Sequence, residues 1–476
     1  MKADLVKTRG PFVVACLGGL LSGLDTSVNI AFPAITASFA IDVSQIQWVV
    51  VSYVLTYSVL LLPAGRLGDS YGHGRIMLVG IVTQGVTFAA CGLAPSFTLF
   101  LLARVSQGAS MALIIGTAPA LVTLSVSEKR QPRALGVYAM LMASGLAMGA
   151  PLGGLLLQKW DWPSVYFFRV PYTGVLLVAA LIAGLHKQTQ SKGRQPLDLV
   201  GAVMFAVGLG LTLFVASRGL TWGWMTSRTL ILGFSAAMVL VLFCFFENRA
   251  TLPLIDLSLF RRPGFGRANL LNALANASMF SIFFLGPYLL VDIRGHGPIS
   301  GGLILGIAPT STALSAWAVG RMIERFGLLR LTRFGLACQG LGLLLFSRTD
   351  ANSSLVSLVV VLALVGVGLG SFQVPNMSFV MASISRSQQG VAGGMTQMVR
   401  AAGLVGGLAV WNTAFVGFRD RRSANLNIED VASPEVFVPT FAEVVGMSGL
   451  LALFGLLLTV GVSFDNQATS ELRDEK

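Results

Sequence analysis

One acidic residue lies deep inside an apolar stretch of this sequence. Asp25 interrupts the segment Phe12–Phe39, which otherwise consists mostly of aliphatic, aromatic and small residues. A charge at the centre of a bilayer costs roughly 2.5–3.5 kcal/mol on insertion scales, so an acid retained there indicates a function. Removal from water favours the protonated form of a carboxyl group. We therefore predict that Asp25 binds and releases a proton. The alternative is a structural acid, paired within a helix bundle.

Two arginines also occur within apolar stretches and need partners there. Arg104 begins the sequence Arg-Val-Ser-Gln-Gly, and Arg169 follows Phe168. Because a guanidinium does not readily lose its proton, it needs an acceptor or water. For Arg104 we expect an interaction with the Asp25 carboxylate, the alternative being hydrogen bonds to backbone carbonyls. For Arg169 we expect a place at the outer membrane interface, with its end in water. Otherwise it could pair with Asp25 or bind an anionic substrate group.

The composition indicates that helices in a membrane carry these residues. The 476-residue chain is 54% hydrophobic and 11% charged, with a mean hydropathy of +0.76, whereas soluble domains contain about 25% charged residues. Apolar stretches of about 20 residues, each long enough to cross a bilayer, recur along the chain. We predict an all-α membrane protein with fourteen spans, which start near residues 12, 47, 75, 98, 133, 166, 197, 229, 267, 300, 331, 354, 391 and 440.

The net charge of +12 reports topology. With an even number of spans and the N-terminus inside, the inner segments hold 22 Lys and Arg and the outer loops hold 8. An excess of Lys and Arg is typical of the cytoplasmic loops of membrane proteins. It predicts a multi-pass protein of the bacterial inner membrane with both termini in the cytoplasm. Its expected partners are the lipid bilayer, protons and a small-molecule substrate, with no nucleic acid, and we expect a monomer.

The spacing of the spans divides the chain into six, two and six. We predict an N-terminal six-helix bundle at 1–187, a linker with two inserted spans at 188–266, and a C-terminal six-helix bundle with a cytoplasmic tail at 267–476. The segments Gly65–Gly72 and Gly320–Gly327 both begin Gly-Arg, carry an acid at the fifth position and end in Gly. Parallel halves of this kind are typical of secondary transporters, with the substrate between them. The polar segment Arg419–Thr440 is expected to be an outer loop, either mobile or folded over the outer mouth.

Several motifs together resemble the major facilitator superfamily, in its fourteen-span drug:proton antiporter branch. They are Leu24–Pro33, Gly65–Arg75, Arg104–Gly108 and Gly145–Gly154. The resemblance covers nearly the whole chain and implies the major facilitator fold, with two extra central transmembrane helices. It also implies a proton-coupled exporter of drugs or metabolites that works by alternating access. Export of one endogenous metabolite, lipid or siderophore is an alternative, and a transporter-like sensor is a remote one.

The resemblance and the span positions also suggest roles for individual residues. Asp25 and Arg104 are the expected proton-coupling pair. Helical spacing places Asn29 on the face of Asp25, where it could hydrogen-bond the carboxyl group. The predicted substrate cavity comprises Asn29, Tyr53, Tyr57, Gln107, Tyr288, Gln373, Asn376 and Arg400. The predicted gating residues are Gly65, Asp69, Gly72, Arg75, Gly149, Pro151, Glu324 and Arg325.

Other classes of chemistry lack their motifs. The sequence has no phosphate-binding loop of the Gly-x-x-x-x-Gly-Lys-Ser/Thr type, so we expect no ATPase. The three histidines are far apart in the sequence, and the four cysteines fall in four different spans. We therefore predict no metal, no cofactor and no enzymatic activity.

Overall fold

The computed structural model of the chain describes residues 2–41, 45–187, 198–249, 259–260, 264–296, 298–350, 353–385, 388–426 and 433–460. Every regular element within these residues is a helix. The first part contains α1 (Lys2–Gly23), η1 (Leu24–Thr26), α2 (Ser27–Ile30), α3 (Phe32–Ser38), α4 (Gln47–Tyr71), α5 (His73–Gly92), α6 (Phe97–Leu124), η3 (Glu128–Arg130), α7 (Gln131–Lys159), α8 (Ser164–Phe167), α9 (Arg169–Ile182) and η4 (Leu185–Lys187).

Two further helices, α10 (Leu199–Trp222) and α11 (Ser227–Glu247), follow. The last part contains α12 (Phe265–Tyr288), the π-helix η6 (Leu289–Ile293), α13 (Pro298–Leu305), α14 (Ile307–Phe326), α15 (Leu328–Phe346), α16 (Leu355–Ala382), α17 (Gln389–Leu426) and α18 (Pro434–Leu457).

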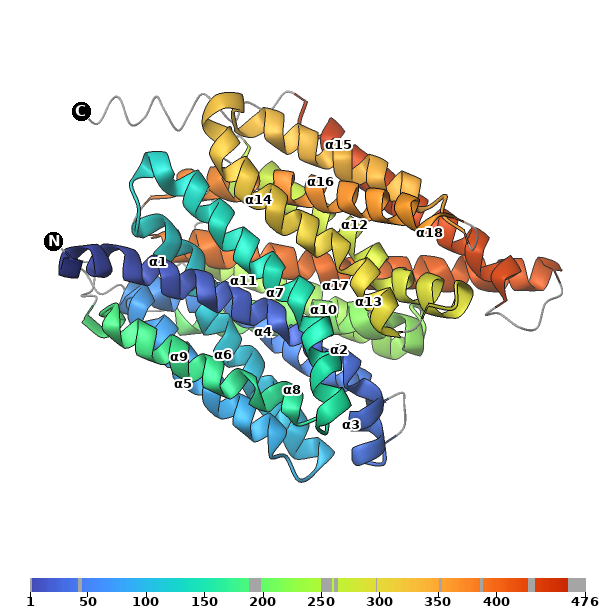
Figure 1. Cartoon of the computed structure of the whole chain (residues 1–476), viewed down its shortest axis with the longest axis horizontal. Helices are drawn as coiled ribbons and strands as arrows, with labels where there is room; N and C mark the ends of the chain where they lie inside the picture. Colours follow the sequence, from blue (N-terminus) through green and yellow to red (C-terminus); the bar gives the residue numbers. More distant parts are fainter. Residues whose placement is uncertain are drawn as a thin grey trace.

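The predicted all-α membrane protein is confirmed. Among the described residues, 13 helices are long and apolar enough to cross a membrane, and α10 contains a shorter apolar segment, Val200–Ala216. The total of fourteen spans therefore stays a prediction. The start of α1 and the end of α18 lie at the same end of the molecule (Figure 1), as an even number of spans requires.

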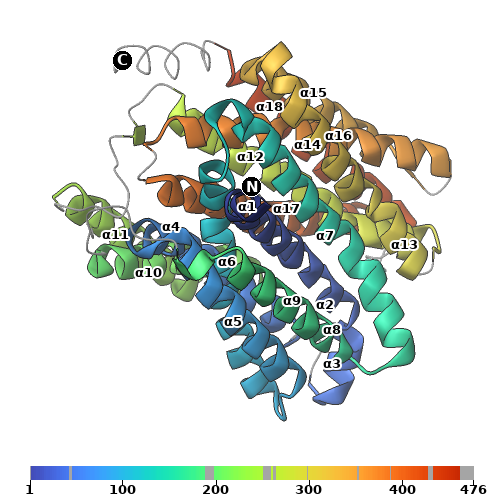
Figure 2. The ribbon, with the colours of Figure 1, turned by 60° about the vertical axis from the view of Figure 1, so that its left-hand side comes forward.

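The helices form two groups with separate hydrophobic cores. One core is built mainly from α1 to α9 and extends to parts of α10, α11, α12, α16 and α17, and the other is built from α12 to α18. The two groups lie against each other along their lengths, as Figures 1 and 2 show. The main contacts between them join α4 to α17 and α7 to α14.

Glycines bring these facing helices together. A Cβ atom on Gly65 of α4 would lie 2.1 Å from the Gly390 carbonyl oxygen of α17. Similarly, a Cβ atom on Gly136 of α7 would lie 2.7 Å from the carbonyl oxygen of Ala316 in α14. Small residues allow such close approach of helices in a membrane, so the seam between the halves is closed here by backbone-to-backbone contact.

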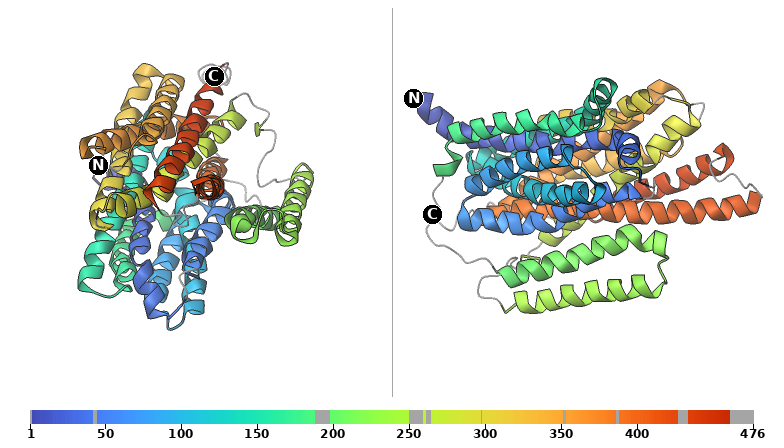
Figure 3. Two further views of the ribbon diagram at one scale, coloured as in Figure 1. Left: turned by 90° about the vertical axis from the view of Figure 1, so that its right-hand side faces the viewer. Right: turned by 90° about the horizontal axis from the view of Figure 1, so that it is seen from below.

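The pair α10–α11 stands to one side of the other helices (Figure 3). The two helices pack on each other, and α10 also contacts α4 and α17. At this contact the ring of Phe214 stacks on Trp48 at 6.1 Å, and the Arg218 guanidinium lies 4.0 Å from the centre of the Trp48 ring. The pair is therefore attached to the seam from outside. The predicted boundaries at 187/188 and 266/267 stay predictions.

The outer segment expected to be a loop is largely helical. α17 continues to Leu426 and α18 begins at Pro434, so within Arg419–Thr440 only residues 427–432 lie outside the described residues. Arg422 donates a 2.7 Å hydrogen bond to Glu443, which ties α17 to α18. Proline is favoured in the first turn of a helix, so Pro434 marks a helix start here.

The tight crossing of α1 and α7 yields a test of the packing. A Cβ atom on Gly145 would lie 2.2 Å from the Leu20 carbonyl oxygen, whereas nothing lies within 4 Å of one on Gly154 of the same helix. We expect Gly145→Ala to destabilise the purified protein by about 1–3 kcal/mol through overpacking. Gly154→Ala should leave stability unchanged or raise it slightly, because Ala has the higher helix propensity. Melting temperatures in detergent would measure both, and equal effects would contradict this packing.

Candidate functional site

The backbone around Asp25 departs from a regular α-helix. α1 ends at Gly23, the 3-10 turn η1 carries Asp25, and a second break falls at Ala31 between α2 and α3. Because these breaks change the helical phase, residues four apart no longer share a face. Asn29 is exposed, and it forms no hydrogen bond with Asp25 among the described residues. The predicted bond between Asp25 and Asn29 is therefore wrong.

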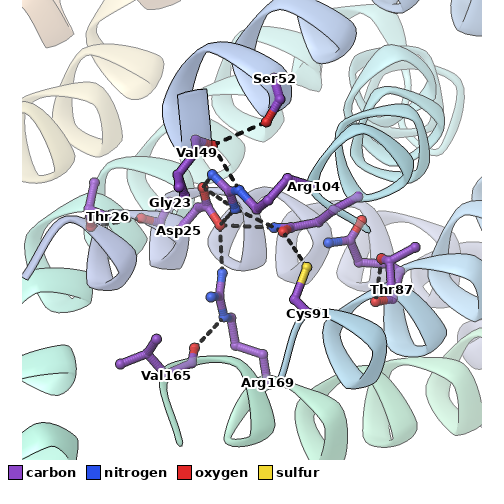
Figure 4. Close-up of polar contacts among 12 residues, drawn as sticks. Gly23, Asp25, Thr26, Val49, Ser52, Thr87, Cys91, Arg104, Val165 and Arg169 are labelled. Carbon is purple, nitrogen blue, oxygen red and sulfur yellow. Dashed lines mark hydrogen bonds and ion pairs between the residues drawn. The ribbon is translucent and has the colours of Figure 1, made fainter. Parts of the chain in front are cut away.

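Asp25 is instead bound by three side chains from two other helices (Figure 4). Nη1 of Arg104, on α6, lies 3.2 Å from Oδ1 of Asp25, and Nη2 lies 3.3 Å from Oδ2. Nε2 of Gln107 donates to Oδ1 at 2.9 Å. Nη1 of Arg169, at the start of α9, lies 2.7 Å from the same oxygen. The Asp25 side chain retains 14% exposure, whereas the side chains of Arg104 and Arg169 retain 2% and 0%.

Arg104 is held on several sides. Its Nε donates to the Val49 carbonyl oxygen of α4 at 3.0 Å, and its Nη1 donates to Oε1 of Gln107 at 2.8 Å. Its guanidinium carbon also lies 4.4 Å from the centre of the Tyr53 ring, which is a favourable place for a cation. Both alternatives considered for Arg104 therefore occur together, because it binds the Asp25 carboxylate and also donates to a backbone carbonyl.

Arg169 is fully buried, so its expected place at the membrane interface is wrong. Its guanidinium carbon lies 4.5 Å from the centre of the Phe88 ring and 5.1 Å from that of Tyr166, and its Nε donates to the Val165 carbonyl at 2.9 Å. The short helix α8 turns the chain so that Arg169 points into the bundle. Burial of a cation is tolerated when it is paired, and Asp25 supplies that pairing.

The cluster therefore contains two guanidinium groups and one carboxylate. Both ion pairs exist only while Asp25 is ionised. Protonation of Asp25 would remove the charge that holds two helices, α6 and α9, against η1. A proton at this position is thus linked to helix packing, which is the coupling that a proton-driven conformational change needs.

A row of aromatic rings leads from this cluster to the C-terminal half. The rings of Tyr53 and Tyr57 stack at 5.9 Å with an interplanar angle of 10°. Beyond Tyr57 lies Arg400 of α17, next to the Tyr57 hydroxyl. The structure thus brings together five of the predicted site residues in one line, namely Asp25, Arg104, Tyr53, Tyr57 and Arg400, with Gln107 beside the first two.

The remaining predicted cavity residues lie elsewhere. Tyr288 is 50% exposed at the end of α12, where its ring packs against Phe284 and Phe437. Asn376 of α16 is 2% exposed, and its Oδ1 has no hydrogen-bond partner among the described residues. Gln373 lies one turn before it on α16 and is half-buried. A substrate-binding role for these three residues stays a prediction.

The predicted gating residues of α4 meet the start of α17. The Asp69 carboxylate accepts hydrogen bonds from the backbone N–H groups of Gly390 at 2.8 Å and Val391 at 3.0 Å. These groups carry the positive end of the helix dipole, which favours an acid there. Nε2 of His73 lies 3.2 Å from the same carboxylate. Gly72 has φ of 97°, a conformation suited to glycine, and ends α4.

The other gating predictions fall in different settings. Glu324 of α14 forms a 2.7 Å ion pair with Arg133 of α7 across the seam, with both side chains about half exposed. Arg325 lies against Phe326, and Arg75 donates to the His186 carbonyl rather than to the α17 end. A Cβ atom on Gly149 would lie 2.0 Å from Thr26, so α7 packs directly on the turn beside Asp25.

Pro151 of α7 lies at a cavity between the halves. The cavity has a volume of about 180 Å³, and it is lined by Pro151, Ala147 and residues of α13 and α14. Its lining is apolar apart from Thr310 and Ser311. A gating role for Pro151 and Gly149 stays a prediction.

Three contributors were not among the predicted site residues. Arg169 binds Asp25, His73 contacts Asp69, and Gln389 pairs with Thr123 across the seam. The sequence indicated that Arg169 needs a partner, since it is a cation within an apolar stretch. Nothing in the sequence marked Gln389, whose partner is distant in the chain. His73 follows Asp69 by four residues, a spacing that could have indicated the contact. No group of three possible metal ligands occurs among the described residues.

The comparisons with known proteins agree with the fold. The Major Facilitator Superfamily profile matches residues 15–408, so the chain belongs to this family of membrane transporters and is not an enzyme. It is 32% identical over 391 residues to "Multidrug resistance protein Stp" of Mycobacterium tuberculosis, which covers 80% of this chain and 71% of that protein. The resemblance to superfamily efflux transporters is thus confirmed.

Two further similarities differ in cargo. The chain is 26% identical over 449 residues to "Riboflavin transporter RibZ" of Clostridioides difficile, covering 94% of this chain and 96% of that one. The crystal structure of the human organic anion transporter MFSD10 superposes with a TM-score of 0.65 at 17% identity, over 95% of this chain and 99% of that one. The last match supports the fold alone.

The arginine cluster predicts an unequal cost of two substitutions. Asp25→Asn leaves Arg104 and Arg169 buried without a counter-charge and should destabilise the protein by about 3–5 kcal/mol. Arg133→Gln breaks the half-exposed pair with Glu324 and should cost about 0–1 kcal/mol. Thermal unfolding of the purified variants would measure both. Similar losses in the two variants would mean that the Asp25 cluster is not a buried ion-pair network.

Proposed function

We propose that the protein is a proton-coupled exporter of small amphiphilic compounds in the bacterial inner membrane, with both termini in the cytoplasm. The main support is the ion-pair cluster, in which protonation of one residue would release two helices. The similarity to a multidrug resistance protein supports the direction of transport. A transporter lowers sensitivity to a drug by removing it from the cell.

The proposed cycle is alternating access. In the outward-facing state, Asp25 takes a proton from outside, the ion pairs with Arg104 and Arg169 open, and the inward-facing state becomes favoured. On the inside, cargo binds and Asp25 releases its proton. The loaded carrier then returns outward, where the cargo leaves.

The contacts at the seam fit one state of this cycle. Asp69, Gln389 and the pair of Arg133 with Glu324 join the halves at the end of the molecule where α1 starts and α18 ends (Figure 1). In the proposed orientation this end is cytoplasmic. The structure then corresponds to a state closed toward the cytoplasm.

The driving force is sufficient for useful export. One elementary charge that crosses 100 mV contributes about 2.3 kcal/mol, hence about 3.5 kcal/mol at roughly 150 mV. Because about 1.4 kcal/mol corresponds to a factor of ten, one proton could support a gradient of roughly a few hundredfold for a neutral cargo.

The central test is the neutral variant of Asp25. In an efflux-deficient bacterium, wild type should lower the accumulation of ethidium and of compounds in an antibiotic panel, and an uncoupler should abolish this effect. Asp25→Asn should raise accumulation to the level of cells without the protein, because it cannot exchange a proton. The matched control Asp161→Asn, at an exposed acid, should behave as wild type. Intact efflux by Asp25→Asn at equal expression would contradict the proposal.

A second measurement separates coupling from folding. In proteoliposomes without a proton gradient, exchange of labelled for unlabelled cargo requires binding and helix movement but no net proton transfer. Asp25→Asn should retain some exchange while losing proton-driven accumulation. If both activities vanish together in a variant that gel filtration shows to be folded, Asp25 is needed for cargo binding or helix movement and the proton-coupling role is contradicted.

The contact between Asp69 and α17 yields a test of the gate. Met395 of α17 is 1% exposed, and we place it behind the closed cytoplasmic end. In a chain whose native cysteines are replaced by Ala, a Met395→Cys reporter should react slowly with an impermeant maleimide in inside-out vesicles. Adding Asp69→Asn should raise the labelling rate severalfold, since the amide loses the charge attraction to the helix N-terminus. Unchanged labelling would contradict a gating role, and Asp161→Asn, at an exposed acid outside this contact, is the control.

Export of a specific metabolite is a second candidate, favoured by the similarity to a riboflavin transporter over 94% of this chain. If cells that express the wild-type protein show unchanged accumulation of ethidium and the antibiotics, the next measurement compares extracellular metabolites with and without the protein.

A further inference from the structure

The membrane interior of this protein has an excess of positive charge. Deep within the described spans the charged side chains are Asp25, Arg104, Arg169 and Arg400. Asp25 balances one arginine, so two positive charges remain uncompensated by carboxylates in this region. Clefts lined by one sign of charge in a low-dielectric setting concentrate ligands of the opposite sign.

Of these three arginines, Arg400 forms the fewest contacts with acceptor groups of the protein. Arg104 and Arg169 are engaged with Asp25 and with backbone carbonyls. Arg400 forms no ion pair within the described part of the chain, and its Nε is buried without a hydrogen-bond partner there. An arginine has five N–H donors and no acceptor, so it requires an electron-rich partner.

Two tyrosine hydroxyls lie beside Arg400. The Tyr57 side chain is 8% exposed, and its hydroxyl lies beside Arg400 and Ser22 without forming a hydrogen bond of regular geometry. Tyr138 of α7 is fully buried and contacts α17 at Gln397, one turn before Arg400. Its hydroxyl oxygen accepts a 2.9 Å hydrogen bond from Nε2 of Gln397. Because this oxygen already accepts a bond, the Tyr138 O–H remains available as a donor.

Arg400 Nε and the Tyr57 hydroxyl are buried without a hydrogen bond of regular geometry, and the Tyr138 O–H can donate as well. Buried polar groups are nearly always hydrogen-bonded in folded proteins, and an unpaired one costs free energy. An anionic oxygen placed among Arg400, Tyr57 and Tyr138 would satisfy all three. The stacked rings of Tyr53 and Tyr57 would provide a flat apolar surface for the rest of the ligand.

We propose that Arg400, Tyr57 and Tyr138 form a subsite that binds the acidic group of an aromatic, amphiphilic cargo. This proposal names the cargo class for the export function proposed above and rests on it. The subsite lies at the seam, since Tyr57 and Tyr138 belong to the N-terminal half and Arg400 to the C-terminal half. A bound anion would therefore contact both halves, as cargo must in alternating access.

The test is equilibrium binding of two probes to the purified protein in detergent, measured by titration calorimetry. The probes are naphthalene-2-carboxylate and naphthalene-2-carboxamide, which have nearly the same shape and differ in charge. We expect wild type to bind the acid roughly tenfold more tightly than the amide. Arg400→Gln should abolish this preference and leave amide binding nearly unchanged.

Three further variants define the site. Arg400→Lys should keep part of the preference, since it keeps the charge but loses the planar fork. Tyr57→Phe should weaken acid binding severalfold without affecting the amide. Arg321→Gln, at an exposed arginine that stacks on Trp317 at 3.9 Å, is the matched control and should bind both probes as wild type does. Gel filtration would verify that each variant is folded.

Several results would overturn the proposal. They are equal binding of the two probes, no acid binding at millimolar concentration, or the same loss of preference in Arg321→Gln as in Arg400→Gln. Because the assay requires neither a proton gradient nor export, its failure is distinguishable from failure of the proposed transport function. If Asp25→Asn abolishes efflux while the acid shows no preference, the exporter remains and the cargo class is wrong.

Discussion

The pairing of one carboxylate with two buried arginines is the constraint on which the N-terminal half depends. Arg104 and Arg169 have almost no access to water, so each must find its partners within the protein. Asp25 meets this need from a turn that interrupts the first span. As a result, η1, α6 and α9 have fixed relative positions, and the Val49 carbonyl ties α4 to the same cluster. The packing of this half and the proposed proton chemistry therefore rest on one set of contacts.

α17 connects the features of the seam. Its first N–H groups bind Asp69 of α4, and its Arg400 lies beside Tyr57 of the same α4. From Val391 to Arg400 the helix rises about 14 Å, so the proposed gate and the proposed cargo subsite are about two and a half turns apart on one helix. A movement of α17 relative to α4 would change both together. The glycine contacts between these helices allow such a movement without displacing bulky side chains.

The C-terminal half has a different polar interior. Here the side-chain amides of Asn272, Asn276 and Gln339 donate hydrogen bonds to backbone carbonyls and to a hydroxyl group. None of these groups carries a charge. The ionisable groups proposed for coupling thus belong to one half, and the other half contributes Arg400 at the seam. The superfamily fold itself does not define the cargo, as proteins similar to this chain are named for multidrug resistance and for riboflavin transport. Cargo must be argued from these side chains.

The sequence by itself determined the membrane class, the all-helical fold, the superfamily and the interaction of Asp25 with Arg104. These features follow from hydropathy, charge asymmetry and local motifs, which depend on neighbours along the chain. It did not determine that Arg169 joins Asp25, that Asn29 turns away, or that Arg400 lies beside Tyr57. Breaks of helical phase at η1 and Ala31 and the close approach of helices far apart in the sequence decide these contacts. Only the tertiary structure brings such groups within hydrogen-bonding distance.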